Sequence, residues 1–339
     1  MEVGVLMVGE PGRSAQTARI AEELGFACVL FPDSQNLAPE VWGQLMLAGA
    51  ATSRIRLGPG VSNSVTRDPA VTASAALALQ VETGGRAVLG IGRGDSAVQR
   101  IGKPLDRLAH FESVLVAVQA YLRGEAVDRD GFESRLEWLP FVKVPKVPVE
   151  VAATGPRVIE AAARHADRIC FAVGADADHV AAALAHARAA AAAAGRDPAS
   201  LRYGAFVNCV VNDDVAVARE AVRGAAATFA RFSSMRGSPV AELPSRLQRA
   251  VEYLREHYDM RNHTRTGVAH TAGIDDEFVD WFAIAGPAAQ ALERLRRLAD
   301  IGLDFVNVIP ASTGAPRDVI ATSLATLGRD VVPALAARA

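Results

Sequence analysis

Three short segments combine glycines with polar or charged side chains in a pattern suited to holding a flat ligand. We name them the Gly60 loop (Gly58-Pro59-Gly60-Val61-Ser62-Asn63), the Asp95 loop (Gly90-Ile91-Gly92-Arg93-Gly94-Asp95) and the Thr154 loop (Ala152-Ala153-Thr154-Gly155-Pro156-Arg157). Glycine admits backbone conformations closed to other residues, so a ligand can approach the chain closely. An ordinary tight turn explains the Gly60 loop equally well.

The Asp95 loop carries one carboxylate and one guanidinium among its glycines. Asp95 is a candidate proton donor or acceptor if its surroundings exclude water, and it is equally a candidate cap for the segment that follows. The spacing resembles GxGxxG, but Asp95 stands at the last glycine position and the required strand–helix unit is not met. Gly92, Arg93 and Gly94 are therefore expected to form a ligand-site wall rather than a dinucleotide fingerprint.

The Thr154 loop joins a strand to a helix that opens at Pro156. Thr154 and Gly155 leave free amides at the positive end of that helix, which suits a phosphate or another anion, with Arg157 as a counter-ion. A plain helix cap explains Thr154 equally well. Asp33 follows another strand and is either a ligand contact or the start of an Asx turn.

Other chemistries lack their motifs. The sequence has no HExxH, no Walker A sequence and no nucleophile elbow with its closing glycine. His263 and His270 are seven residues apart in a loop, so no metal site is predicted. Cys28, Cys170 and Cys209 have no metal-ligand or CxxC spacing, which indicates buried thiols in a reducing compartment.

Composition and charge narrow the class of protein. The 339 residues are half apolar and carry a formal net charge of -2, so neither nucleic acid nor an anionic membrane is an expected partner. The N-terminus has no basic segment and becomes polar by Gly9, so it reads as a strand and not as a signal peptide. No apolar run is predicted to be long enough to span a bilayer. We therefore expect a cytoplasmic protein that acts on a small-molecule substrate.

The elements that must position these loops alternate between strand and helix. Eight strands are predicted, at residues 3–8, 27–31, 55–58, 87–91, 147–152, 168–172, 203–211 and 305–309. Helical patterns are predicted at about residues 13–25, 39–53, 69–84, 106–123, 156–166, 176–194, 213–230, 287–301 and 316–337. Eightfold repetition of one unit favours an α/β fold of the (β/α)8 barrel type over an open doubly wound sheet, which is the competing interpretation.

Helix boundaries carry their usual residues. Gly25 and Gly302 suit the left-handed position that ends a helix. Four prolines are predicted at the first position of a helix: Pro69, Pro156, Pro287 and Pro316.

The whole chain, residues 1–339, is thus expected to form one barrel domain, in which residues 231–280 break the alternation between the seventh and eighth strands. An insertion there would lie over the barrel mouth, where such folds keep their chemistry. A solvent-exposed surface excursion is the alternative.

Residues 57–74 and 89–95 together resemble the bacterial luciferase-like superfamily, and most of all its coenzyme F420-dependent branch, including methylenetetrahydromethanopterin reductases. Residues 153–167 and 282–287 agree with it, and the resemblance extends over essentially the whole chain. It implies a homodimeric enzyme that binds a deazaflavin at the carboxyl ends of the barrel strands. It also implies a cis peptide at Gly60–Val61, which supports one face of the ring.

The resemblance implies a role for each loop. Asp33 corresponds to an acidic residue beside the deazaflavin head, and the phosphate-bearing tail of the cofactor would lie near Ala153, Thr154 and Gly155. The ring would lie against the remaining residues, of which Asp95 is the candidate proton donor or substrate polariser: Gly60, Val61, Asn63, Gly92, Arg93, Gly94 and Asp95.

Two departures from the family bear on the substrate. Leu6 stands where methanopterin reductases have a glutamate, and Ser34 stands where sugar-phosphate dehydrogenases have a histidine. The first hypothesis is an F420-dependent oxidoreductase that transfers a hydride between deazaflavin C5 and a small organic substrate. The alternatives are an FMN-dependent monooxygenase of the same superfamily and a flavin-binding relative without turnover.

Overall fold

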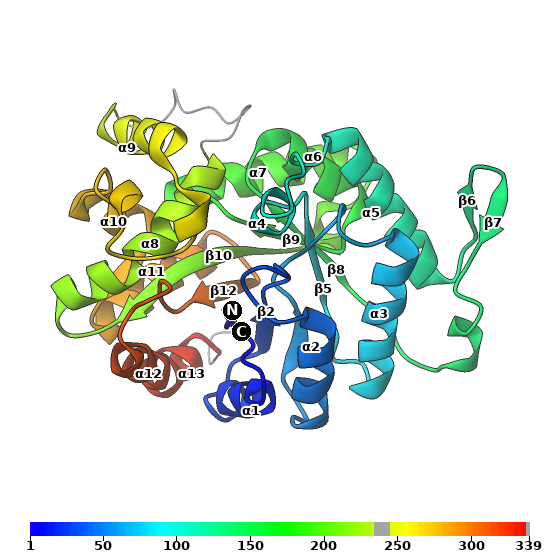
Figure 1. The fold of residues 1–339 in the computed structure, drawn as a ribbon, viewed down its shortest axis with the longest axis horizontal. Helices are drawn as coiled ribbons and strands as arrows, with labels where there is room; N and C mark the ends of the chain where they lie inside the picture. Colours follow the sequence, from blue (N-terminus) through cyan, green and yellow to red (C-terminus); the bar gives the residue numbers. More distant parts are fainter. Residues whose placement is uncertain (234–244, 337–339) are drawn as a thin grey trace.

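The structure, a computed structural model, describes residues 1–233 and 245–336. Eight parallel strands form a barrel (Figure 1). They are β1 (Glu2–Leu6), β2 (Cys28–Phe31), β3 (Arg56–Pro59) continued by β4 (Ser62–Asn63), β5 (Leu89–Gly92), β8 (Val149–Ala153), β9 (Arg168–Phe171), β10 (Arg202–Val211) and β12 (Phe305–Ile309). The predicted (β/α)8 barrel is confirmed, and strand ends differ from the prediction by at most two residues.

The barrel closes at β3 and β4, two short strands that together form one of its eight strands. β3 pairs with β2, whereas β4 pairs with β5, through Ser62 opposite Ile91 and Asn63 opposite Gly92. A bridge between Leu57 and Ala87 joins β3 to the segment before β5. The peptide between Gly60 and Val61, which separates the two half-strands, is cis. The Gly60 loop is therefore part of the barrel wall at its mouth.

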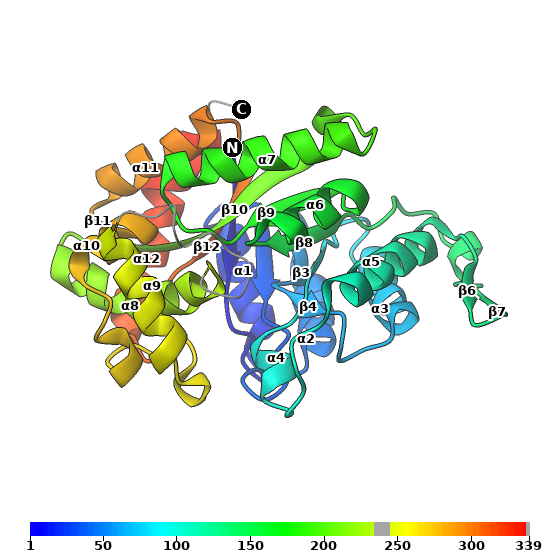
Figure 2. The same ribbon diagram turned by 90° about the horizontal axis from the view of Figure 1, so that it is seen from above.

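The helices cover the outside of the barrel (Figures 1 and 2). They are α1 (Ser14–Glu23), α2 (Val41–Ala50), α3 (Pro69–Glu82), α5 (Leu108–Arg123), α6 (Pro156–His165), α7 (Ala177–Ala193), α8 (Val215–Ser233), α11 (Ala288–Asp300), α12 (Arg317–Thr326) and α13 (Val332–Ala336). Gly25 and Gly302 have φ angles of 82° and 101°, as their helix-ending role predicts.

Two of the four proline predictions are wrong by one residue. Pro69 and Pro156 begin α3 and α6. Pro287 and Pro316 instead immediately precede α11 and α12, with ψ angles of 159° and 136°. Both residues are extended, because a proline fixes φ but leaves ψ free to take a non-helical value.

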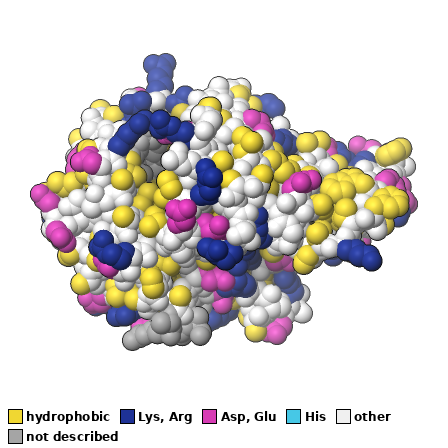
Figure 3. Space-filling model, turned by 90° about the horizontal axis from the view of Figure 1, so that it is seen from below, with side chains coloured by type: hydrophobic (Ala, Val, Ile, Leu, Met, Phe, Trp, Pro, Cys, Tyr) yellow, Lys and Arg dark blue, Asp and Glu magenta, His cyan; other side chains and the backbone are white. Residues whose placement is uncertain are grey.

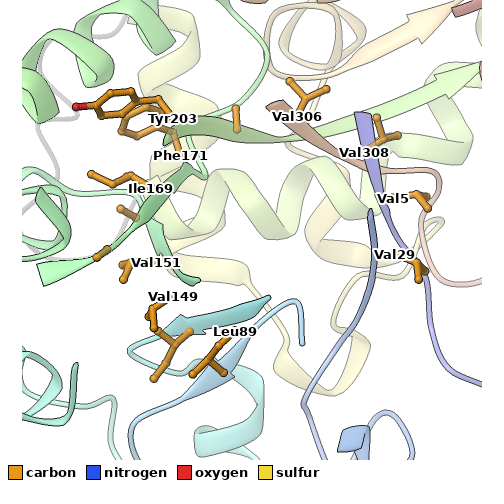
Figure 4. Close-up of a cluster of buried hydrophobic side chains, with 14 of the residues drawn as sticks. Val5, Val29, Leu89, Val149, Val151, Ile169, Phe171, Tyr203, Val306 and Val308 are labelled. Carbon is orange, nitrogen blue, oxygen red and sulfur yellow. The ribbon is translucent and has the colours of Figure 1, made fainter. Parts of the chain in front are cut away.

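Alternate strand residues pack outward against the helices (Figure 4). Val149 and Val151 of β8 belong to this layer, as do Val306 and Val308 of β12. The intervening residues face the barrel interior, because side chains alternate along a strand. The three cysteines are free and buried. Burial raises the pKa of Cys28 and of Cys209 to about 12, so these thiols stay protonated.

The amino-terminal end of the barrel holds a buried polar network. Glu150 and Arg168 are neighbours in the β8–β9 register, and Arg168 Nε donates to Glu150 Oε2 at 2.8 Å. Asn307 Nδ2 donates to Glu150 Oε1 at 3.1 Å. The Arg168 guanidinium also lies 3.9 Å from the centre of the Phe305 ring. Each charge in this network has a partner of opposite sign or a hydrogen bond.

The segment between β10 and β12 contains elements that the sequence did not predict. They are α9 (Ser245–His257), α10 (Asp276–Phe282) and β11 (Ile284–Gly286), and β11 pairs in parallel with the end of β10. Residues 234–244 of the predicted insertion lie outside the described part of the chain. A hairpin of β6 (Val127–Arg129) and β7 (Phe132–Ser134) was also missed, and it projects from the body (Figures 1 and 2).

One helical segment, 317–336, is long and apolar enough by length and composition to cross a membrane, which the sequence analysis did not expect. In the structure its apolar side packs in the main core, where Leu327 and Val331 are fully buried. The amino group of Met1 donates to the carbonyl of Leu335 at 3.3 Å. These contacts place part of the segment in the core of the described fold.

Candidate active site

A large cavity opens at the carboxyl ends of the strands, with a volume of about 1680 Å³. Ligand pockets for one small molecule usually measure roughly 300–1,000 Å³, so this cavity has room for two ligands side by side. Ten of the site residues predicted from the sequence line it: Asp33, Gly60, Val61, Asn63, Gly92, Arg93, Gly94, Asp95, Thr154 and Gly155.

Ala153 is the predicted site residue that the structure does not place on the cavity wall. It is fully buried in the outer layer between β8 and the helices, and Ala152 lines the cavity instead. Alternation along β8 explains the difference, because two successive strand residues cannot both face the interior.

The Gly60 loop forms the wall between β2 and β5. Gly60 N donates to Phe31 O at 2.8 Å. A Cβ at Gly60 would lie 2.8 Å from Leu30 Cβ and 2.9 Å from Leu6 Cδ1, so only glycine fits. Asn63 Oδ1 accepts from the backbone amides of the two turn residues that follow Ser64. The Nδ2 atom of Asn63 is buried and has no partner among the described residues.

Asp33 is held rigidly at the end of β2. Its side chain is 3% exposed, and its carboxylate accepts from Ser62 Oγ at 2.7 Å and pairs with Arg67. Ser34, which follows it, lies 2.9 Å from Ser96, Oγ to Oγ. These contacts join the ends of β2, β4 and the Asp95 loop into one rim.

Asp95 faces the cavity between two partners. Arg231 Nη1, from the end of α8, lies 2.8 Å from both Asp95 carboxylate oxygens, and Gln99 Nε2 donates to Oδ1 at 2.6 Å. Asp95 does not cap the short helix that follows, since its side chain makes no capping hydrogen bond there. Gly94 has a φ of 84°, and a Cβ there would lie 2.4 Å from Val98 Cγ2. The loop therefore depends on glycine at this position.

The Thr154 loop presents the amino terminus of α6 to the cavity. No side chain caps this helix, although Thr154, Gly155, Pro156 and Arg157 all line the cavity. Uncapped first-turn amides at a helix amino terminus favour an anion. The capping role considered for Thr154 is thus absent.

Sequence reasoning missed most of the arginines around the cavity. Arg107, Arg261, Arg265 and Arg317 line it, together with the anticipated Arg157. Within residues 1–233 and 245–336, none of these five side chains has an ion-pair partner. In Figure 3, basic side chains gather beside a hollow in the surface. Their signal in the sequence is weak, because the arginines come from four segments that lie far apart along the chain.

A polar cluster on the segment after α9 was also missed. The hydroxyl of Tyr258 lies 2.7 Å from His263 Nδ1 and 2.8 Å from Thr228 Oγ1. Burial lowers the pKa of His263 to about 4 and raises the pKa of Tyr258 to about 12. The guanidinium of Arg231 lies over the Tyr258 ring, 4.7 Å from its centre. His263 and Thr228 both line the cavity.

Comparison with known proteins gives a consistent picture. Residues 4–304 match the family model described as luciferase-like monooxygenase. The chain is 31% identical over 331 residues to 5,10-methylenetetrahydromethanopterin reductase of Archaeoglobus fulgidus, which covers 94% of each chain. It is 32% identical over 268 residues to the F420-dependent hydroxymycolic acid dehydrogenase of Mycobacterium tuberculosis, which covers 74% of this chain and 72% of that one.

A solved structure shows the same fold. The coenzyme F420-dependent tetrahydromethanopterin reductase of Methanopyrus kandleri superimposes with a TM-score of 0.76, covering 98% of each chain at 22% identity.

Proposed function

Because this chain belongs to the luciferase-like monooxygenase family, we propose that it is a coenzyme F420-dependent oxidoreductase that transfers a hydride between the deazaflavin C5 and a small organic substrate. The observation that carries the proposal is the cavity at the strand carboxyl ends, which combines a glycine-lined wall with an anion-binding helix terminus. The mycobacterial relative and the solved reductase structure described above are both F420-dependent by name.

The residues around the cavity fit an anionic cofactor. The uncapped amino terminus of α6 and the unpaired Arg157 supply donors and positive charge for a phosphate. Arg107 and Arg317 extend that charge along the rim, which suits a tail with further negative groups. Ala153 supports this site from behind the strand and does not contact the ligand.

The other side of the cavity fits a flat ring system. Gly60, Val61 and Gly92 present backbone and small side chains to it. The Nδ2 atom of Asn63 is a buried hydrogen-bond donor without an acceptor among the described residues. Such a group costs about 1–3 kcal/mol of folding free energy, so a ligand acceptor placed there would be favourable. Asp33 lies at the same rim and is proposed to contact the ring's polar edge.

The bound deazaflavin would accept or donate the hydride, and the chain supplies positioning and charge. We propose that Asp95, held by Arg231 and Gln99, faces the reacting centre and acts as proton donor or polariser of the substrate. Positioned groups of this kind are preorganised by their own hydrogen bonds, so they need not reorient during the reaction.

We further propose that residues 231–280 close the substrate side of the barrel mouth. Phe232, Arg261 and His263 of this segment line the cavity, which supports the placement. Leu6 also lines it, apolar where methanopterin reductases carry a glutamate, so a pterin substrate is not favoured. Ser34 is bonded to Ser96 and lacks the ring of a catalytic histidine.

Titration with F420 and with FMN tests the proposal. We expect the purified protein to bind F420 more tightly than FMN in equilibrium dialysis, with a change in the deazaflavin absorbance. Tight FMN binding without F420 affinity would support the monooxygenase alternative. F420 binding without hydride exchange at C5 across a broad substrate panel would support a binding protein without turnover.

We also propose that the chain is a homodimer in the cytoplasm. Large apolar side chains are exposed on three adjacent helices, Ile20 on α1, Leu47 on α2 and Val71 on α3, and the three buried free thiols suit a reducing compartment. Light scattering after size-exclusion chromatography should give twice the chain mass, and Leu47→Glu should shift it toward the monomer. A monomeric parent protein would overturn the assembly.

A further inference from the structure

The histidine at residue 263 has one ring nitrogen held and the other open. Its Nδ1 lies 2.7 Å from the hydroxyl of Tyr258. Its Nε2 has no partner among the described residues, and this atom is not buried. Because His263 lines the cavity, we infer that Nε2 is exposed toward it. A donor or acceptor exposed in a ligand cavity, with the opposite edge of its ring fixed, is placed to contact the ligand.

A second histidine nearby shows the contrast. His270 packs against the same Tyr258 ring, with 4.4 Å between ring centres, but it is 1% exposed and neither of its nitrogens has a partner in the part of the chain that the structure describes. His270 therefore fills space beneath Tyr258, whereas His263 presents a free nitrogen to the cavity.

The hydrogen bonds around Tyr258 determine which nitrogen of His263 carries the proton. A phenol is a good donor and a neutral imidazole nitrogen is a good acceptor, which favours donation from Tyr258 to Nδ1 and a ring proton on Nε2. The Thr228 hydroxyl can give its single proton to the phenol oxygen, 2.8 Å away, or to the carbonyl of Gly224, 3.0 Å away, and Thr264 N donates to Thr228 Oγ1 at 3.1 Å. When the proton goes to the phenol oxygen, the Tyr258 proton is left for Nδ1. Burial lowers the pKa of His263 to about 4, so the ring is neutral at pH 7.

The backbone next to His263 is strained. Thr264 has a φ of 61°, a conformation that is rare for a β-branched residue. Two contacts of Thr264 hold this conformation. Its backbone N–H donates a hydrogen bond to Thr228 Oγ1, and its hydroxyl oxygen lies 2.7 Å from Thr313 Oγ1. Residues kept in such conformations cluster at functional sites, where the surrounding structure enforces a particular side-chain direction.

We propose that His263 donates a hydrogen bond from Nε2 to the reacting oxygen of a carbonyl or alcohol substrate, with Tyr258 as the positioning residue. The inference rests on the proposed function, since it takes the substrate to be an oxygen compound whose carbon exchanges the hydride. A neutral imidazole N–H polarises a carbonyl oxygen without placing a full charge in the site. Asp95 then faces the same cavity as an acceptor or proton carrier, so the two groups have separate tasks.

The first test needs no cofactor. In ¹⁵N-labelled protein, the His263 ring, assigned from the signal lost in His263→Gln, should show a protonated Nε2 and an unprotonated Nδ1. Tyr258→Phe should replace this single tautomer by a mixture. A ring protonated at Nδ1 in the parent protein would overturn the proposal.

The second test uses cyclohexanone as a carbonyl probe. Titrated to its solubility limit, it should shift the Nε2 resonance of His263 more than Nδ1, both without F420 and with it. His263→Ala should weaken its apparent affinity about two- to tenfold, the worth of one hydrogen bond. His263→Gln, whose amide nitrogen occupies a similar position, should restore most of it. A His263 ring that no concentration of cyclohexanone shifts would overturn the proposal.

The matched control is His257→Ala, since His257 is exposed on α9 and stacks on Tyr253. It should alter neither the His263 resonances nor the cyclohexanone affinity. F420 affinity, measured separately on each variant, should stay at the parent value. If the parent protein does not bind F420, the proposed function is wrong. The His263 proposal is still tested in that case, because the tautomer and the cyclohexanone shift are measured without F420.

Discussion

The two ends of the barrel differ in whether their charged side chains have partners within the protein. At the amino-terminal end, Glu150 and Arg168 are buried, pair with each other and are bonded or stacked to Asn307 and Phe305. At the carboxyl-terminal end, Asp33 and Asp95 pair with Arg67 and Arg231. Five further arginines line the cavity there without an ion-pair partner among the described residues, which also leave the Nδ2 of Asn63 unsatisfied.

The difference separates structure from function on one scaffold. The buried pair of Glu150 and Arg168 lies away from the cavity and offers no group to a ligand. Charges that repel one another around a cavity reduce stability, and a bound anion relieves that cost. This division agrees with the general behaviour of such barrels, in which one face maintains stability and the other carries chemistry.

The largest expected effect is a loss of stability when the buried network at the amino-terminal end is disrupted. Glu150→Gln leaves the buried Arg168 charge uncompensated, so the free energy of unfolding should fall by roughly 3–5 kcal/mol in urea titrations. F420 affinity of the folded protein should not change. Arg329→Ala, which removes an exposed pair with Asp330, is the control and should cost less than about 1 kcal/mol. Equal losses in the two variants would show that the buried network does not stabilise the barrel.

The next effect concerns the mouth. Asp95→Asn keeps the shape of the side chain and removes its charge, so turnover with F420 and a substrate found by screening should fall by about 10²-fold or more, the usual contribution of a positioned acid or base. The affinity for F420 should change little. Full turnover with unchanged binding would exclude Asp95 as the proton donor.

A third prediction concerns pH. The folded pKa of His263, about 4, lies below its ordinary value of 6.5 because the ring is buried. Between these values the unfolded chain binds a proton that the folded chain does not, so stability should fall as pH drops from 6.5 toward 4, by about 1–3 kcal/mol. His263→Gln should reduce that slope, although His270, whose pKa burial also lowers, keeps part of it. An unchanged slope in His263→Gln would contradict the buried neutral ring.

The smallest expected effect tests whether Arg157 and the amino terminus of α6 bind the anionic tail of the cofactor. Arg157→Ala should weaken F420 binding by about 1–2 kcal/mol, the worth of a charge-assisted hydrogen bond. A deazaflavin riboside without the phosphate-bearing tail should bind parent and variant alike. The control is Arg196→Ala, because Arg196 donates to the carbonyl of Ala163 at the other end of α6. Equal weakening for both ligands would move the anion site away from the α6 terminus.

Most of the fold is predictable because each barrel unit repeats one local pattern. Helix-ending glycines such as Gly25 and buried strands such as β2 depend on neighbours in sequence. The elements between β10 and β12 were missed because their amphipathic pattern is short and their packing is tertiary. β11, for instance, consists of Ile284–Gly286 and depends on its pairing with the end of β10.

The candidate site was predictable only in part. Glycine-rich loops mark the mouth because they follow strands, so Gly60 and Gly94 stand out in the sequence. Strand alternation, applied to β8, separates Ala152 from Ala153, and this signal was available but not used. The pairing of Asp95 with Arg231 joins residues 136 positions apart, and no local pattern reveals it. His263 was considered only as a metal ligand, because its partner Tyr258 is recognisable only in the folded chain.

Arg100 connects the two sides of the mouth. Its guanidinium donates to the carbonyls of Met260 and Arg261, at 2.9 and 3.0 Å, from the helix that follows the Asp95 loop. Any ligand that orders the Asp95 loop thereby also orders the segment carrying His263. By thermodynamic linkage the coupling is reciprocal, so occupancy of either half should raise the affinity of the other by the same factor. We therefore expect preferred-order kinetics, with an enzyme that discriminates poorly among substrates until its first ligand is bound.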